Sequence, residues 1–153
     1  MRVLRAHSLL EFLKPKKISN IQVYVDGAAR GNPGPAAAGV VVCDSAGKTV
    51  KTLSVALGHA TNNVAEYMAL VLGLQEALLL GAKEVSLFTD SELMAKQWSG
   101  EYKIKDDHLR RLHRLAAHLA PAFKRLKVSH VPRERNTLAD KEANRALDAH
   151  LLF

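Results

Sequence analysis

Four acidic residues stand where strands end or helices begin, the positions at which a fold can gather charge for chemistry. They are Asp26, Glu66, Asp90 and Asp140. Strand ends and helix starts can converge at one edge of a sheet, so these carboxylates are expected to meet there. Carboxylates in a cluster repel one another unless a cation neutralises them, and oxygen ligands of this kind favour Mg²⁺ or Mn²⁺ over zinc.

A set of carboxylates without paired cysteines points to one reaction class. When two divalent ions lie about 4 Å apart, one can activate a water molecule and the other can stabilise the leaving oxygen of an in-line attack at phosphorus. Cys43 is the sole cysteine, so one chain can form neither an internal disulfide nor a cysteine-based zinc site. The residue types therefore predict a metal-dependent nuclease.

Each acid also has a purely structural explanation. The pair Asp26-Gly27 is a common turn sequence, and Glu66 lies three residues after Asn63, where it could complete a capping box. Asp90 could cap the helix that follows it, and Asp140 could offset the positive end of the last helix. Spacing alone leaves both interpretations open.

The hydrophobic pattern predicts the elements that must position these acids. Three strands joined by short turns come first, followed by a long apolar helix that Asn63 can cap and Gly81 can end. A strand, two helices, a fifth strand and a helix capped by Asn136 complete the chain. The expected strands cover 21–26, 38–43, 49–56, 85–89 and 128–131, and the expected helices cover 63–80, 91–98, 107–119 and 136 to the C-terminus. This order predicts an α/β fold, in which helices flank a mixed sheet.

Length and charge indicate one domain with a polyanionic partner. The 153 residues suffice for one core, and we expect a basic extension over 1–18 followed by a single domain over 19–153. The 22 Lys and Arg residues exceed the 15 Asp and Glu residues and leave a net charge of +7, which suits a nucleic acid. The apolar stretch 69–80 is too short to span a bilayer, and residues 1–13 lack the cleavage site of a secretory signal. We therefore expect a cytoplasmic monomer without membrane association.

Four segments of the chain together resemble those of a known family. They are DGAARGNPGPA over 26–36, TNNVAE over 61–66, TDSEL over 89–93 and PRERNTLAD over 132–140, in this order. In these segments, and over about 21–146, the chain is similar to type 1 ribonuclease H. The resemblance implies the RNase H fold, a five-stranded mixed sheet in the order 3-2-1-4-5.

The resemblance also implies a reaction and its cofactors. It predicts an endonuclease that hydrolyses the RNA strand of RNA–DNA hybrids and leaves 5′-phosphate and 3′-hydroxyl ends. Two Mg²⁺ or Mn²⁺ ions are expected with substrate bound. The residues that match the family's metal-binding acids are Asp26, Glu66, Asp90 and Asp140.

Contacts with the hybrid are implied at a further set of positions. Gly27, Asn32, Asn62 and Asn63 match family positions near the minor groove of the hybrid, where amide and backbone groups can contact the 2′-hydroxyls. Thr61 matches the position that holds a phosphate of the DNA strand. Asn32 could instead serve only its Gly/Pro turn, and Asn63 could serve only as a helix cap. We expect dual roles for both.

Two residues match the family's auxiliary residue, which helps to position the attacking water or to release product. His130 stands ten residues before Asp140, as in well-known bacterial members, and Arg133 stands seven residues before it, as in the archaeal type. We favour Arg133, because His130 is predicted to end a strand rather than to lie in a flexible loop. Either residue could instead bind only phosphate or solvent.

The basic protrusion of the family's longer members is absent. Only ten residues separate Trp98 from Leu109, so the chain resembles the short, archaeal type. Substrate binding is then expected to use Lys103 and Lys105. The polar face of the 107–119 helix is either a solvated surface or a contact with nucleic acid, and it carries Arg110, Arg111, His113 and Arg114.

Two other functions fit the same fold. The chain could be a nuclease with another task, such as DNA strand transfer or junction cleavage, or a hybrid-binding module without catalysis. The Asn-rich segment 61–63 argues against the first alternative, and the complete set of four acids argues against the second.

Overall fold

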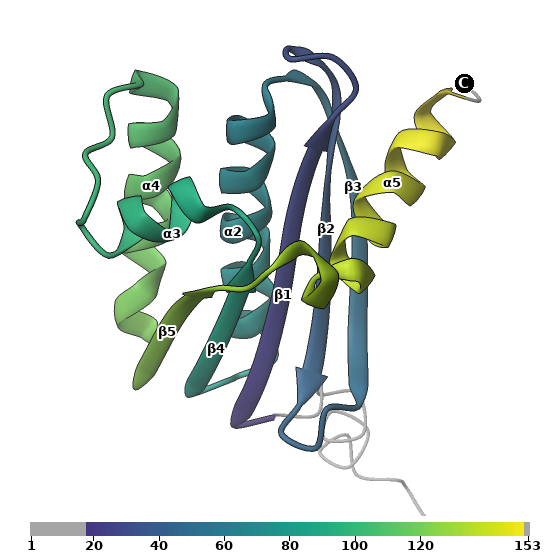
Figure 1. Ribbon diagram of the computed structural model, residues 1–153. Helices are drawn as coiled ribbons and strands as arrows, with labels where there is room; N and C mark the ends of the chain where they lie inside the picture. The colour runs from purple at the N-terminus through teal and green to yellow at the C-terminus, as the bar shows by residue number, and fades with distance from the viewer. Residues whose placement is uncertain (1–17, 152–153) are drawn as a thin grey trace, which may run out of the picture.

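A five-stranded mixed sheet forms the centre of the computed structural model, which describes residues 18–151 (Figure 1). The strand order is β3-β2-β1-β4-β5, with β1, β2 and β3 antiparallel and with β4 and β5 parallel to β1. The strands are β1 (Asn20–Ala29), β2 (Gly34–Asp44), β3 (Thr49–Ala60), β4 (Glu84–Thr89) and β5 (Arg125–His130). The fold class and the strand order predicted from the sequence are confirmed.

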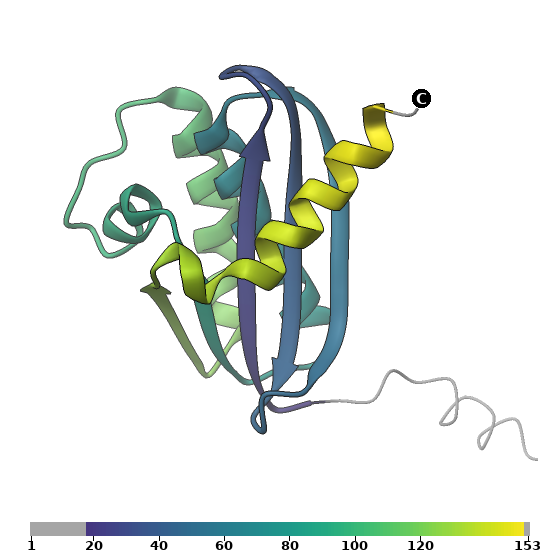
Figure 2. The same ribbon diagram turned by 45° about the vertical axis from the view of Figure 1, so that its right-hand side comes forward.

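Helices cover the two faces of the sheet unequally. Figures 1 and 2 show α2 and α4 packed behind the sheet and α5 crossing the opposite face over β1, β2 and β3. The helices are α2 (Asn62–Leu79), α3 (Glu92–Trp98), α4 (Asp107–Leu119) and α5 (Thr137–Leu151), with short 3₁₀ turns η1 (Ala120–Ala122) and η2 (Arg133–Arg135). No helix within residues 18–151 is long and apolar enough to cross a membrane.

The main core lies between β1 and α2. Val23 and Val25 of β1 are fully buried, as are Leu70 and Leu74 of α2. At Gly73 the helix runs so close to the sheet that an added Cβ would lie 2.7 Å from a methyl group of Val25. Because α4 covers the other side of α2, the nearly all-apolar composition of α2 follows from burial on most of its sides.

The start of α2 corrects one expectation. Thr61, not Asn63, caps the helix, because its Oγ1 accepts a hydrogen bond of 3.2 Å from the backbone N–H of Val64. Asn63 lies inside the helix, and Glu66 falls in its second turn. The capping-box explanation of Glu66, and the explanation of Asn63 as only a cap, are therefore wrong.

Two further expectations about α3 and α4 are wrong. Ser91 caps α3 by accepting a hydrogen bond from Met94, so Asp90 is not the cap of that helix. His113 of α4 is half-buried against the ring of Trp98, at a centroid distance of 5.4 Å, and does not belong to the solvated face of α4. The strands β1, β2 and β3 also extend several residues beyond their predicted ends, because backbone pairing continues where the side-chain pattern fades.

The extension predicted over residues 1–18 lies almost wholly outside the described residues. Its last member, Ile18, packs against the core and donates a backbone hydrogen bond of 3.1 Å to the carbonyl oxygen of Leu80. The described part of the domain therefore includes Ile18.

Close approach of α5 to β2 depends on Gly39. A Cβ at this position would lie 2.1 Å from the carbonyl oxygen of Ala139 and 2.5 Å from the backbone nitrogen of Ala143. Both atoms belong to the backbone of α5, so neither can rotate away. This contact places the start of α5 over the sheet.

We expect Gly39→Ala to lower the free energy of unfolding by about 1–3 kcal/mol, the usual cost of overpacking. Urea denaturation measures this change. An unhindered glycine-to-alanine change in a strand would be neutral or stabilising, because glycine loses more backbone entropy on folding. An unchanged or higher midpoint would contradict the close contact. Thr52→Ala, at an exposed position of β3, is the control.

Candidate metal centre

A cleft of about 510 Å³ opens where β1, β4, α2 and α5 meet. All four acids predicted from the sequence line it: Asp26, Glu66, Asp90 and Asp140. One carboxylate oxygen from each of Asp26, Glu66 and Asp90 lies within 4.8 Å of the others. Asp140 is outside this tight group but stands close enough to Asp26 to affect its pKa. The expected convergence of the acids is confirmed.

Sheet geometry brings Asp26 and Asp90 together. Val25 of β1 pairs in parallel with Thr89 of β4, and each acid is the next residue along its chain. Asp90 follows the last residue of β4, as expected. Asp26 does not end its strand, since β1 continues to Ala29 and Asp26 pairs with Gly39 of β2. The Asp26-Gly27 pair is therefore not a turn.

Gly27 lets α2 come close enough to add Glu66 to the group. A Cβ on Gly27 would lie 2.1 Å from the carbonyl carbon of Ala65 and 2.2 Å from the nitrogen of Glu66. The backbone N–H of Gly27 donates a hydrogen bond of 3.1 Å to Oε2 of Glu66. Gly27 therefore both admits the helix and orients its carboxylate.

Asn136 fixes the start of α5 beside the same strand. Its backbone carbonyl oxygen accepts a hydrogen bond of 3.1 Å from the N–H of Asp140, as expected of a residue at the helix start. Its side-chain Nδ2, however, is buried and donates a hydrogen bond of 2.9 Å to the carbonyl oxygen of Val25. The side chain thus ties η2 and α5 to β1 immediately before Asp26, instead of capping the helix as the sequence suggested.

Crowding raises the proton affinity of the acids. Burial, and next the negative charge of Asp90, raise the pKa of Asp26 from 3.8 to about 7. Burial, and next the charge of Asp26, raise the pKa of Glu66 well above its ordinary value. A divalent cation would relieve this repulsion, and a donor set made only of carboxylate oxygens fits Mg²⁺ or Mn²⁺. The residues present therefore fit the predicted cofactor.

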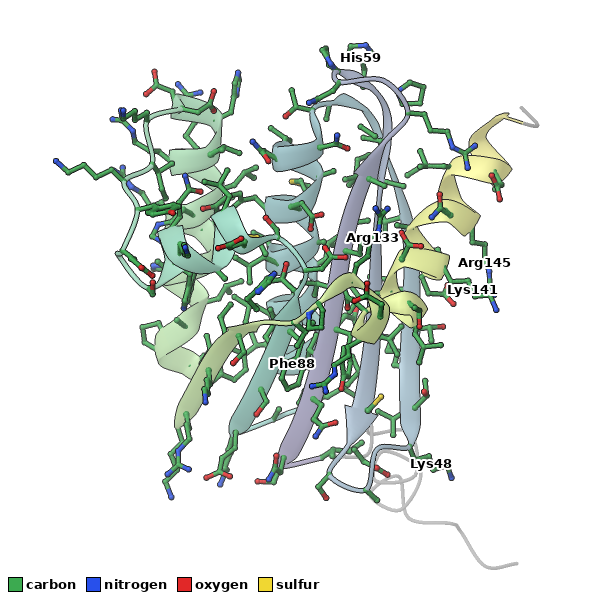
Figure 3. All side chains as sticks on the ribbon, in the orientation of Figure 1. Lys48, His59, Phe88, Arg133, Lys141 and Arg145 are labelled. Atoms are coloured by element: carbon green, nitrogen blue, oxygen red, sulfur yellow. The ribbon has the colours of Figure 1, made fainter. Side chains whose placement is uncertain are left out.

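The two candidates for the auxiliary residue lie in different places. Arg133, in η2, lines the cleft (Figure 3). His130 ends β5 opposite Thr89, as predicted, and is exposed on the side of Glu92. It does not line the cleft. Figure 3 also shows that Lys141 and Arg145 point to the outer side of α5.

Hydrogen bonds join the Asn-rich segment 61–63 to Ala29 and Asn32 at one wall of the cleft, and we call this arrangement the clasp. The side-chain oxygen of Asn62 accepts a hydrogen bond of 2.9 Å from the N–H of Ala29, and the backbone N–H of Asn62 donates one of 3.0 Å to the side-chain oxygen of Asn32. Asn62 lines the metal cleft, whereas Asn32, Thr61 and Asn63 line a smaller neighbouring hollow. Asn32 therefore does more than form its own turn. The predicted binding residues Lys103 and Lys105 are exposed on the loop between α3 and α4 and line neither hollow.

Some residues of the cleft were not foreseen. Arg30 lines it and forms an ion pair with Asp148 of α5. Asn144 also lines it and donates a hydrogen bond of 3.0 Å to the carbonyl oxygen of Asp140. The spacing of Asn144, one helical turn after Asp140, could have identified it, because such residues share a helix face. Nothing in the spacing links Arg30 to Asp148.

Comparison with known proteins assigns the family. Residues 24–146 match the family model described as reverse transcriptase-like. Ribonuclease HI of Halobacterium salinarum is 41% identical over 136 residues, which cover 89% of this chain and 68% of that protein. The chain belongs to the type 1 ribonuclease H family.

Solved structures of this family share the architecture. RNase H1 from Halobacterium salinarum superimposes with a TM-score of 0.84 at 42% identity, over 86% of this chain and 99% of that one. LC11-RNase H1, solved in complex with an RNA/DNA hybrid, gives a TM-score of 0.82 at 42% identity, over 86% and 99% of the two chains.

A mycobacterial relative is much longer. A bifunctional protein of Mycobacterium tuberculosis is 47% identical over 130 residues, which are 84% of this chain. The chain spans only 36% of the length of that relative. The similarity therefore covers only part of that protein.

Removal of one charge from the cluster should stabilise the metal-free protein. Because the pKa of Asp26 is about 7 in the folded state and 3.8 ordinarily, its contribution to stability is present at low pH and is lost as the pH rises toward 7 and above. Asp26→Asn avoids this loss. We expect its free energy of unfolding at pH 8, without divalent metal, to exceed that of the native chain by roughly 1–3 kcal/mol.

Urea denaturation across pH 4–8 tests this expectation. The difference should shrink toward pH 4 and also in saturating Mg²⁺, because the cation stabilises the native cluster preferentially. Glu101→Gln removes one exposed charge outside the cleft and serves as the control. A metal-free Asp26→Asn protein less stable than the native chain at pH 8 would refute the repulsion.

Proposed function

We propose that this ribonuclease H-family chain hydrolyses the RNA strand of RNA–DNA hybrids. The observation that carries the proposal is the group of three carboxylates within 4.8 Å, with Asp140 at its edge. The raised pKa of Asp26 supports it, because uncompensated negative charge at this point favours a bound divalent cation. The similarity to LC11-RNase H1, whose structure contains an RNA/DNA hybrid, supports the choice of substrate.

The four acids would hold two Mg²⁺ or Mn²⁺ ions in the presence of substrate. Ions bound there would supply an activated water and charge stabilisation at the leaving oxygen, and the products would be 5′-phosphate and 3′-hydroxyl ends. The chain's own part is orientation: Gly27 holds the Glu66 carboxylate through its N–H, and Asn136 holds β1 next to Asp26. Preorganised ligands reduce the cost of bringing the reacting groups together.

Selection of the RNA strand would rest on the clasp beside the cleft. Asn62 lines the metal cleft, and Asn32 and Asn63 line the neighbouring hollow, so their side-chain amides and the backbone near Gly27 would contact 2′-hydroxyls across the minor groove. Thr61 would hold a phosphate of the DNA strand in the neighbouring hollow. A monomeric state and a cytoplasmic location remain predictions from the sequence.

Asp26→Asn should abolish cleavage of a labelled RNA–DNA hybrid, because it removes the acid at the middle of the cluster. A gel assay with and without Mg²⁺ measures this, with cooperative unfolding of the variant as evidence that it is folded. The native chain should cut the hybrid and leave a DNA duplex of matched sequence intact. Cleavage by Asp26→Asn near the native rate, or equal cleavage of the two duplexes, would refute the proposal.

Arg133 is the auxiliary residue in this proposal, because it lines the cleft and His130 does not. We expect Arg133→Ala to lower kcat at least about tenfold, which corresponds to about 1.4 kcal/mol of lost stabilisation. His130→Ala should stay within about twofold, a difference of only about 0.4 kcal/mol. Single-turnover cleavage of the hybrid provides the rates. The opposite ranking of the two variants would assign the role to His130.

A further inference from the structure

A second hollow lies between the segment 61–63 and the start of α4. It has a volume of about 280 Å³, and the residues that line it include Thr61, Asn63, Asp106 and His108. Asn62, between the first two, lines the metal cleft itself. The segment 61–63 is therefore a wall shared by the two hollows.

A third hollow lies on α4. It measures about 260 Å³ and is lined by Asp107, Arg110, Arg111 and Arg114, which we call the α4 arginine cluster. Asp107 stands between Asp106 and His108, so the segment 106–108 borders both the second and the third hollow. A strand of nucleic acid that runs from 61–63 past the start of α4 would reach this cluster.

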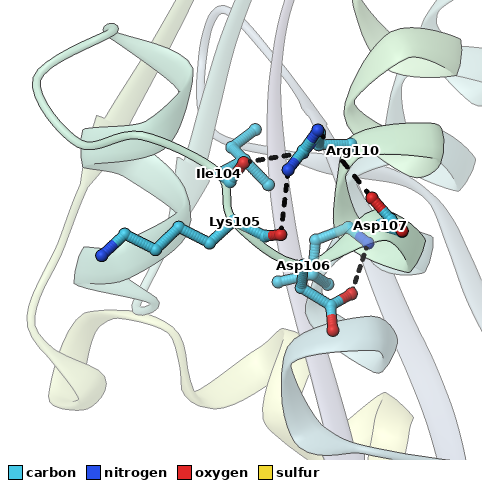
Figure 4. A network of polar contacts seen from close by, with 6 residues as sticks. Ile104, Lys105, Asp106, Asp107 and Arg110 are labelled. Carbon is cyan, nitrogen blue, oxygen red and sulfur yellow. Dashed lines mark hydrogen bonds and ion pairs between the residues drawn. The ribbon is translucent and has the colours of Figure 1, made fainter.

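Within the cluster, Arg110 stabilises the loop between α3 and α4. Its guanidinium donates hydrogen bonds to the carbonyl oxygens of Ile104, at 2.9 Å, and Lys105, at 3.1 Å, and it lies 3.8 Å from the carboxylate of Asp107 (Figure 4). These bonds hold the loop that replaces the missing protrusion. The side chain of Lys105 extends away from Arg110 in Figure 4.

Arg111 and Arg114 are the members of the cluster with free charge. Both are exposed, and neither forms an ion pair with any residue in the range 18–151. They lie three residues apart on α4, so their side chains share one helix face. Two unpaired guanidinium groups on one face are suited to phosphates.

The acids nearby do not cancel this charge. Residues 101–114 contain five Lys or Arg and three Asp or Glu. The carboxylate of Asp106 is engaged in capping α4, where it accepts a hydrogen bond of 3.0 Å from the N–H of Leu109, and Asp107 lies against Arg110. The charge that remains available to a partner is therefore positive, and its natural complement is a polyanion.

We propose that Arg111 and Arg114 bind backbone phosphates of the hybrid several nucleotides away from the cleavage site. The inference rests on the proposed function and extends it, since it assigns a second contact region to the same substrate. Phosphate contacts of this kind add affinity and fix the substrate on the protein without reading its sequence. These phosphate contacts lie away from the cleavage site, so only a hybrid long enough to reach α4 gains affinity from them.

Substrate length and salt dependence provide the test. Cleavage of a hybrid of about 6 base pairs, roughly 20 Å long, is compared with cleavage of one of about 24 base pairs. The double variant Arg111→Ala with Arg114→Ala should lower the ratio of kcat/KM between the long and the short hybrid about tenfold near physiological salt. The slope of log KM against log salt concentration for the long hybrid should fall by about 1 to 2.

A charge-matched double variant is the control. Arg125→Ala with Lys127→Ala removes two exposed cations from the beginning of β5, which pairs with the beginning of β4, whereas Asp90 of the metal centre follows the end of β4. It should keep the native ratio between long and short hybrids, although it lowers the net charge equally. Exposed Arg-to-Ala changes on a helix preserve helix propensity, so the first variant should remain folded.

Each outcome has a distinct meaning. A ratio and a salt slope that match those of the native chain would overturn the α4 contact while the proposed function stands. Equal losses in both double variants would also overturn it, because they would reflect net charge alone. Failure of the native chain to cut either hybrid would refute the proposed function, and the inference with it.

Discussion

Repulsion between buried and half-buried carboxylates is the constraint on which the rest of this structure depends. Burial and the neighbouring charge of Asp90 raise the pKa of Asp26, and the same causes act on Glu66. A fold that left these side chains free would let them separate into water. Here, the backbone contact at Gly27 and the buried amide of Asn136 prevent this separation. Repulsion between these acids lowers the stability of the metal-free domain, and the same negative charge favours the binding of a cation.

The rest of the domain holds the acids together despite their repulsion. β1 lies at the centre of the sheet, paired on both sides, and its side chains Ile21, Val23 and Val25 are fully buried in the core shared with α2. Such a strand opens only with the whole domain, so the acid that it carries has little freedom. The parallel pairing of β1 with β4 then places Asp90 next to Asp26 by register alone.

Much of the site was predictable because its residues lie in local patterns. The alternation of strands and helices predicted the fold class, and the four acids stood out by their positions at the predicted boundaries of elements. Thr61 was missed as the helix cap because Thr61, Asn62 and Asn63 are all good capping residues, and only the backbone angles distinguish them. The importance of Gly27 and Gly39 depends on how closely a helix approaches, which is a tertiary property. The pairing of Arg30 with Asp148 joins residues 118 positions apart.

The hydrogen bonds from Arg110 to the loop between α3 and α4 affect which sequence changes this loop can tolerate. Arg110 donates its hydrogen bonds to the main-chain oxygens of Ile104 and Lys105. A main-chain acceptor is present in every amino acid, so these two hydrogen bonds do not depend on which side chains the loop carries. Lys103 and Lys105, whose side chains are exposed, can therefore be exchanged at little folding cost, whereas Ile104 packs against the core. The two exposed positions are suitable places for changing affinity.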